Sequence, residues 1–191
     1  LSWEMVEKMN NRGSMPNISS LAESSPTGIT KSTIPTMTCP ALPSLYTGQN
    51  PGNLGIFDFV KPDGTITNLT DVDAPKLWDY LDAEGKRSFV AGMRTTHPAP
   101  KINGVFISGI LDPEDEPHYV TPMSYQEEAD RFQNASVNLQ PLIDADDRAG
   151  IADRLVDSIE TKTDVYLEVL DLEQPALDFG LLWLSASDSA Q

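Results

Sequence analysis

Hydrophobic residues recur at helical spacing in several segments of the chain. The run "WEMVEKMNN" from Trp3 is amphipathic, and "MPNISSLAES" predicts a second short helix that is entered through Pro16. Two more helices are predicted over 123–136 and 146–173. The second of these is the longest, and its apolar side chains fall near one stripe, as on a helix that packs against a core.

The segment 73–85 carries the clearest helix signals. Asp73 can cap the helix, Trp78 and Leu81 share one face, and Gly85 is placed to end it. The stretch "RSFVAGM" follows directly and is typical of a strand. A helix that leads into a strand is the repeating unit of α/β folds.

Other apolar runs have the character of strands. Residues 28–34 are β-like and stop before Pro35, and a short strand is predicted around 105–107 between Pro- and Gly-rich turns. The run 179–184 is almost continuously apolar, which is typical of a strand buried on both faces of a parallel sheet. The sequence therefore predicts an α/β fold, a parallel-rich sheet flanked by helices.

The chain length suits one sizeable core, so we expect a single domain over 1–191. The segment 95–125 is rich in turns around its short strand. We expect this segment to form an insertion or lid and not part of the core.

The charge balance narrows the function. The chain has 29 acidic and 13 basic residues and a formal net charge of −16. Such a surface repels nucleic-acid phosphates, so no nucleic-acid-binding module is expected. Either a solvated acidic face or adaptation to high salt explains the excess of acid, and its spread through the chain favours the halophilic interpretation. A single cysteine fits a reducing cytoplasm, and no apolar run is long enough for a membrane helix.

Candidate chemistry centres on "TCPALPSLYTG", which begins at Thr38. Pro40 suits the first helical position and Gly48 suits the left-handed residue after a helix end. Thr38 is then expected at a helix N-terminus, where unpaired N–H groups favour an anion. Its hydroxyl is either a helix cap or a nucleophile that faces a phosphate. Cys39 is either an alternative nucleophile or a small packed side chain.

Asp188 is the second candidate, because it closes the strand predicted at 179–184. Ligands gather at the carboxyl ends of strands in open α/β sheets, and Thr38 is expected there too, after the strand at 28–34. A metal held by Asp188 could activate the Thr38 hydroxyl, although an aspartate after a strand is also a common turn residue. Neither histidine has a spacing that identifies it as a base.

The segment "STIPTMTCPALPSLYTGQNPGNLGIFDF" resembles the nucleophile block of the type I phosphodiesterase/nucleotide pyrophosphatase family in the alkaline phosphatase superfamily. "GSMPNISSLAESS", "KLWDYLDAEGKRSFV" and "THPAPKINGVFISG" resemble successive blocks of its prokaryotic branch, in the same order. The resemblance covers nearly the whole chain. It implies an alkaline-phosphatase-like sheet, of which 1–191 is the N-terminal part, incomplete in this chain.

This resemblance also implies a site. Thr38 matches a nucleophile that bonds one of two divalent metal ions, zinc or alternatively manganese, and is transiently phosphorylated. Asp188 matches a metal ligand, and further ligands are expected before Leu1 and after Gln191. The backbone N–H of Cys39 lies beside the nucleophile and can donate to a phosphoryl oxygen. The implied activity is hydrolysis of small phosphodiesters, with the 191 residues alone inactive.

Three positions depart from the family pattern. Phe59 stands where the nucleotide pyrophosphatases have an Asn that holds a phosphoryl oxygen, Leu54 replaces a His, and His97 stands where many relatives have Tyr. These changes leave nucleotide specificity open. The same site could serve a phosphonate, sulfate or phosphomonoester hydrolase or a phosphomutase, although Thr38 argues against a sulfatase. A non-catalytic binding fragment or paralogue is the alternative from a different class.

Overall fold

The computed structural model describes residues 3–109, 118–136, 138–173 and 176–186. In this part of the chain a four-stranded sheet has the order β3-β2-β1-β4. Strands β1 (Ser88–Arg94), β2 (Gly104–Gly109) and β4 (Phe179–Leu182) are parallel, and β3 (Val120–Thr121) runs antiparallel to β2. The predicted α/β class with a parallel-rich sheet is confirmed.

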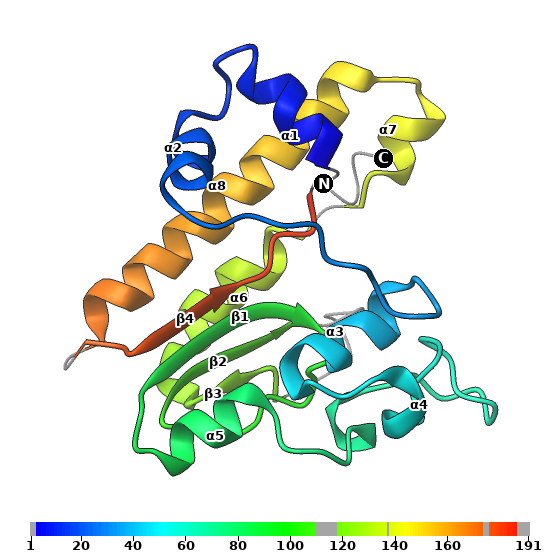
Figure 1. Ribbon diagram of the computed structural model, residues 1–191, viewed down its shortest axis with the longest axis vertical. Coiled ribbons are helices and arrows are strands. Elements are labelled where there is room, and N and C mark those ends of the chain that lie inside the picture. The colour runs from blue at the N-terminus through cyan, green and yellow to red at the C-terminus, as the bar shows by residue number, and fades with distance from the viewer. Residues whose placement is uncertain (1–2, 110–117, 137, 174–175, 187–191) are drawn as a thin grey trace.

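Helices cover both faces of this sheet (Figure 1). One face carries α3 (Thr38–Thr47), α4 (Pro51–Leu54) and α5 (Leu77–Ala83), and the other carries α6 (Gln126–Asn134) and α8 (Arg148–Leu172). The arrangement is a three-layer sandwich.

The side chains of β1 and β2 point alternately to the two faces of the sheet and so divide the core into two layers. Val90 and Phe106 lie in the cluster with α3 and α5, whereas Phe89, Val105 and Ile107 lie in the cluster with α6 and α8. All five side chains are fully buried. Successive side chains of a strand point to opposite faces, so these two short strands serve both halves of the core.

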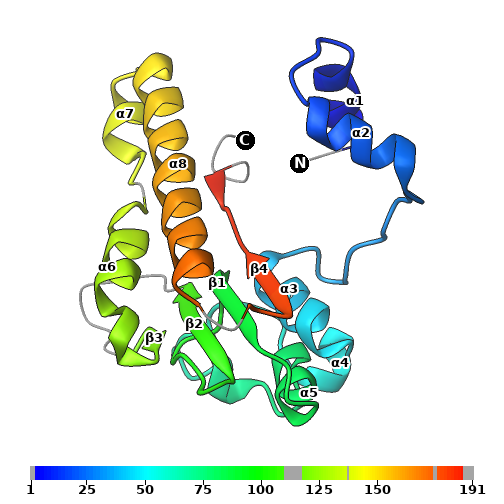
Figure 2. The ribbon, with the colours of Figure 1, turned by 90° about the vertical axis from the view of Figure 1, so that its left-hand side faces the viewer.

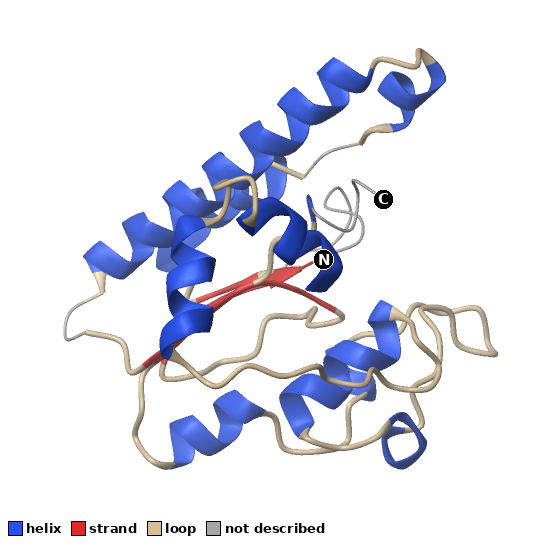
Figure 3. Ribbon diagram, turned by 45° about the horizontal axis from the view of Figure 1, so that its top comes forward, coloured by secondary structure: helices blue, strands red, loops and turns tan. Residues whose placement is uncertain are grey.

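The remaining helical segments lie outside these layers or connect them; they are α1 (Trp3–Asn10), α2 (Pro16–Ser24), η1 (Leu69–Asp71), η2 (Met123–Tyr125) and α7 (Gln140–Asp144). Figure 2 shows α1 and α2 set apart from the sheet, and Figure 3 shows the long loop that leads from them toward α3. The sequence predicted α1 and α2 correctly. It missed α7, whose five residues are too few to show a helical period.

The strand predicted at 28–34 is wrong. These residues form no regular structure, and Ile29 and Ile34 are 89% and 78% exposed. An extended, apolar run becomes a strand only when another backbone pairs with it. No described residue pairs with this segment, so its β-like composition remains without consequence here.

The double-sided burial expected at 179–184 is also wrong. Strand β4 ends at Leu182, is half-buried or exposed along its length, and pairs with β1 on one side only within the described residues. An apolar run indicates burial but does not tell whether neighbours stand on both sides.

The segment 95–125 contains a core strand. β2 lies between β1 and β3, and Val105, Phe106 and Ile107 are fully buried. For these residues the expectation of a lid outside the core is wrong, because flanking turns are as compatible with a central strand as with an insertion. The rest of 95–125 and the single-domain assignment over 1–191 stay predictions.

Helix α5 begins later than predicted. It starts at Leu77, and the Asp79 carboxylate accepts the Lys76 N–H at 2.8 Å, so Asp73 is not the cap. Lys76 holds the N-cap position that Asp73 was expected to hold, and Asp79 is the acidic residue of the first turn. The predicted end at Gly85 fits its positive φ of 68°.

No helix among the described residues is both long and apolar enough to cross a membrane.

Trp78 generates a stability prediction. Its side chain is 1% exposed and contacts the rings of Tyr46 and Phe106 at 4.9 and 5.1 Å between centroids, which joins α5, α3 and β2. We expect Trp78→Ala to lower the free energy of unfolding by about 3–5 kcal/mol in urea titrations. The matched control is Tyr80→Ala on the exposed side of α5, with an expected change within about 0.5 kcal/mol. Equal losses in the two variants would contradict this assignment of the core.

Candidate active site

Thr38 is the first residue of α3, and Met37 precedes it as the N-cap. The helix packs against β1 and begins on the side of the sheet where β1 and β2 end (Figure 1). It ends at Gly48, whose φ of 70° is the left-handed conformation expected from the sequence. Pro40 is the third helical residue and not the first. The structure therefore has Thr38 at a helix N-terminus, as the sequence predicted.

The first turn of α3 offers unpaired donors. Within the described residues the N–H groups of Thr38 and Cys39 meet no acceptor, and Pro40 has no N–H. The first bond of the helix runs from the Ala41 N–H to the Met37 carbonyl at 3.1 Å. Two free donors and the positive end of the helix dipole make this turn suited to an anion.

The Thr38 hydroxyl is not used as a cap in the described part of the chain. Met37 holds the N-cap position, and no side chain makes a capping hydrogen bond there. Thr38 itself is half-buried, so a ligand can reach its hydroxyl. This geometry leaves the oxygen available for chemistry, and the nucleophilic role stays a prediction.

Cys39 anchors the start of α3. Its side chain is fully buried, and Sγ donates to the Asp58 carbonyl oxygen at 3.0 Å. The hydroxyl of Thr67, also buried, donates to the same oxygen at 2.8 Å. One carbonyl thus holds two donors, which ties the helix start to the loop after α4 and to the residues before η1.

This environment disfavours Cys39 as a nucleophile. Burial raises the pKa of the Cys39 thiol, and the carboxylates of Asp58 and Asp71 raise it further, against a smaller opposing effect of Thr67. The thiol therefore stays protonated at neutral pH, whereas reactive cysteines have lowered pKa values and exposed sulfurs. Of the two interpretations of Cys39, the structure favours the packed side chain.

Phe59 and Leu54 pack against the core cluster beside α3. The Phe59 side chain carries no hydrogen-bond donor, and its backbone N–H donates to the Asp58 carboxylate at 2.6 Å. Phe59 thus offers no side-chain or backbone N–H donor to a phosphoryl oxygen.

A pocket of about 440 Å³ lies next to this anchor and is lined by Gly55, Ile56, Phe57, Asp58, Val60, Lys61, Pro62, Thr67 and Asp71. The Lys61 ammonium contacts the Asp71 carboxylate at 2.7 Å in its wall. Burial raises the pKa of Asp71, but Lys61 and the Asn68 N–H outweigh it, so the pKa is lowered overall. Asp58 and Thr67 line this pocket and also take part in the hydrogen bonds that hold the start of α3. Thr38 does not line the pocket.

His97 and His118 contribute backbone bonds to this half of the fold. The His97 carbonyl accepts the Leu69 N–H, and the His118 carbonyl accepts the Ala99 N–H, each at 2.8 Å. Neither bond involves α3. The structure adds no catalytic assignment for either residue.

The metal prediction is only partly covered by the structure. Asp188 lies outside the described residues, and in the part that is described no three His, Cys, Asp or Glu side chains group as a metal site would require. Thr38 is the one predicted metal ligand whose surroundings are known. Its hydroxyl oxygen and a carboxylate are both suitable ligands for Zn²⁺ or Mn²⁺.

Sequence reasoning missed Thr67 as part of this site. Its hydroxyl reaches Asp58 across nine residues of chain, and its sequence context has no motif. Such a contact can be found only once the loop and the helix are placed together in space.

The chain matches the model of one known family. The model of type I phosphodiesterase / nucleotide pyrophosphatase covers residues 1–191. Neither the curated proteins nor the solved structures contain a significant match to the chain.

The burial of Cys39 generates a prediction about thiol reactivity. We expect 5,5′-dithiobis(2-nitrobenzoate) to label Cys39 at pH 8 at least about 100-fold more slowly in the folded protein than in urea, because the sulfur is buried and its pKa is raised. The same reagent on the Cys39→Ser variant gives the background. Rapid labelling of the folded protein would instead favour the reactive-thiol interpretation.

Proposed function

The chain belongs to the type I phosphodiesterase / nucleotide pyrophosphatase family, and from this premise we propose that it hydrolyses phosphodiesters with Thr38 as the nucleophile. The observation that supports this role is the position of Thr38 at the start of α3, beside two N–H groups without acceptors in the described part of the chain. The family supports hydrolysis of phosphoesters at the level of the class. The threonine intermediate is the proposal.

The first turn of α3 binds and orients the phosphoryl group. The Cys39 N–H donates to a non-bridging oxygen, and the helix dipole stabilises its negative charge. The bond from the Cys39 thiol to Asp58 and the bond from Thr67 to the same carbonyl keep this turn in place. Fixed donors aimed at a developing charge lower the barrier because they need no rearrangement during the reaction.

Thr38 then carries the phosphoryl group between two displacements. The Thr38 hydroxyl gives up its proton as its oxygen bonds to phosphorus, the bond from phosphorus to the leaving alcohol breaks, and the released alkoxide takes up a proton. Water attacks the phospho-threonine, phosphorus–oxygen cleavage returns Thr38, and a phosphomonoester leaves. A covalent intermediate of this kind replaces one difficult step with two easier ones.

Two divalent metal ions complete this proposal. Thr38 and Asp188 would hold them, together with the further ligands that the family resemblance implies. Bound zinc or manganese would lower the pKa of the nucleophile hydroxyl and would stabilise negative charge on the phosphoryl oxygens. A lone threonine hydroxyl ionises too weakly to attack at neutral pH, so this requirement follows from its chemistry.

Small phosphodiesters are the proposed substrates. Phe59 presents no donor at the position of the family Asn and packs against the core. One contact that the nucleotide pyrophosphatases use is therefore missing. The acidic surface also argues against long polyanionic substrates.

The test is hydrolysis of bis-p-nitrophenyl phosphate by the full-length protein with Zn²⁺ or Mn²⁺, in low and in molar salt. Removal of the nucleophile in Thr38→Ala should lower kcat/KM by at least about 1,000-fold. The matched control is Thr36→Ala, which removes an exposed hydroxyl two residues earlier and should retain activity. Chelation of the metals should abolish hydrolysis reversibly.

Trapping the intermediate separates Thr38 from other nucleophiles. A rapid acid quench of ³²P-labelled diester should label wild-type protein on Thr38 and leave Thr38→Ala unlabelled. Activity retained by Thr38→Ala would refute the nucleophile. A folded, metal-loaded protein that is inactive on diesters but active on monoesters or phosphonates would move the assignment to another ester of the same site.

A further inference from the structure

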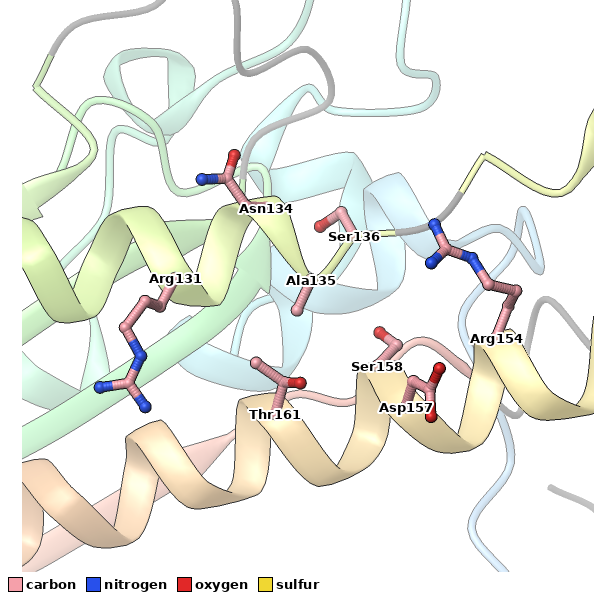
Figure 4. A pocket seen from close by; sticks show the side chains of 8 residues that line it. All are labelled: Arg131, Asn134, Ala135, Ser136, Arg154, Asp157, Ser158 and Thr161. Carbon is pink, nitrogen blue, oxygen red and sulfur yellow. The ribbon is translucent and has the colours of Figure 1, made fainter.

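A second pocket lies between α6 and α8, on the face of the sheet opposite α3 (Figures 1 and 4). Its volume is about 330 Å³, and every residue that lines it except Ala135 carries a polar side-chain group. Ser136, just after α6, lies opposite Arg154 and Ser158 of α8, whose side chains rise toward it (Figure 4). Thr161 adds a further hydroxyl to the α8 side. The volume is that of a small-molecule site.

A buried cation lies next to Ser136, one of the residues that line this pocket. Lys162 is 7% exposed, its ammonium donates to the Ser136 hydroxyl at 3.2 Å, and it lies 5.2 Å from the centre of the Phe132 ring. In the described part of the chain no carboxylate pairs with it. An ammonium has three donors, so this buried group is only partly satisfied.

The hydroxyl of Ser158 lies on the same side and opens onto the pocket. Ser158 is 8% exposed, lies one turn before Lys162 on α8, and has no hydrogen-bond partner among the described residues. A hydroxyl without a protein partner is available to donate to a ligand in the pocket. An acceptor in the pocket would receive a hydrogen bond from the Ser158 hydroxyl. It would receive another from the Ser136 hydroxyl, which itself accepts one from the Lys162 ammonium.

The side chains that line the pocket carry a net positive charge, whereas the whole protein is strongly negative. The chain carries −16, yet the lining of this pocket has two guanidinium groups and one carboxylate, that of Asp157. Arg131 is paired with Glu168 at 2.6 Å, but Arg154 has no ion pair within the described residues. Burial lowers the pKa of Lys162, and the nearby Arg94 adds to this effect, so a bound anion would stabilise both cations.

The end of α6 does not oppose an anion strongly. Two of its last four carbonyls accept hydrogen bonds, Arg131 from the Ala135 N–H at 3.1 Å and Gln133 from the Ser136 N–H at 2.9 Å. The Asn134 side chain points away from α8 (Figure 4). The side chains that line the pocket supply hydroxyls, guanidinium groups and the single carboxylate of Asp157.

We propose that this pocket binds a phosphate group, either as inorganic phosphate or as a small phosphomonoester, at a site distinct from Thr38. Arg154 and the hydroxyls of Ser158 and Ser136 donate to the oxygens, and Lys162 supplies buried positive charge. Donors that converge from two helices suit a tetrahedral group with several acceptor oxygens. The proposal does not depend on catalysis, because α6 and α8 lie across the sheet from α3.

The experiment titrates the full-length, metal-free protein with inorganic phosphate and with glycerol 2-phosphate at constant ionic strength, followed by calorimetry. Saturable binding is expected in wild type. Lys162→Met keeps the apolar volume and removes the charge, and we expect it to raise Kd about tenfold. Arg154→Gln should raise Kd about fivefold, and Asp157→Asn should lower it by about threefold, because a repelling carboxylate is removed.

Arg148→Gln is the matched control. It removes one positive charge from the same helix, but Arg148 is 90% exposed beside Asp146 and lies outside the pocket, so Kd should not change. Far-UV circular dichroism checks the fold of Lys162→Met, and Arg154→Gln alters an exposed side chain that folding does not require. Thr38→Ala should leave this Kd unchanged even if it abolishes hydrolysis.

Either ligand binding alone supports the site and identifies the source of its phosphate. Absence of saturable binding at millimolar concentrations of both ligands overturns the proposal. Equal affinity in wild type, Lys162→Met and Arg154→Gln also overturns it. Binding that only Thr38→Ala removes would place the anion at the start of α3 and refute the second site.

Discussion

Burial of β1 and β2 on both faces is the constraint on which the rest of this structure depends. Because adjacent side chains point to opposite faces, Val90 and Phe106 require a cover on one side while Phe89 and Ile107 require one on the other. Helices α3 and α5 provide the first cover and α6 and α8 the second. The two candidate sites lie on these two sets of helices, so the sheet both separates them and holds each in place.

The start of α3 is held from two directions. Its buried side packs through Tyr46 and Trp78 onto the sheet, and its first turn is tied by Cys39 to the Asp58 carbonyl. A helix N-terminus that is fixed in this way can leave its own N–H groups unpaired without losing its position. Side-chain contacts thus hold α3 in place, while the backbone N–H groups of its first turn stay available to a ligand.

The acidic character of the chain makes the buried cation Lys162 informative. Surface carboxylates keep a protein hydrated and repel other anions. A lysine that is withdrawn from solvent without a carboxylate partner in the described chain carries a desolvation cost that ordinary packing does not offset. In this molecule that lysine adjoins a polar pocket, and the helix start on the other face also favours an anion. The two features each favour an anion, one on each face of the sheet.

The sequence by itself determined what depends on neighbours along the chain: α1, α2, α6 and α8, the strand β1, the end of α3 at Gly48, and the position of Thr38 at a helix start. Tertiary structure decided what depends on distant partners. The apolar runs at 28–34 and 179–184 look alike as strands, yet only one has a backbone beside it, and β2 lies at the centre of the sheet despite its turn-rich surroundings. Thr67 and Lys162 carry no signal in sequence, because burial and hydrogen bonding arise only when separate elements pack together.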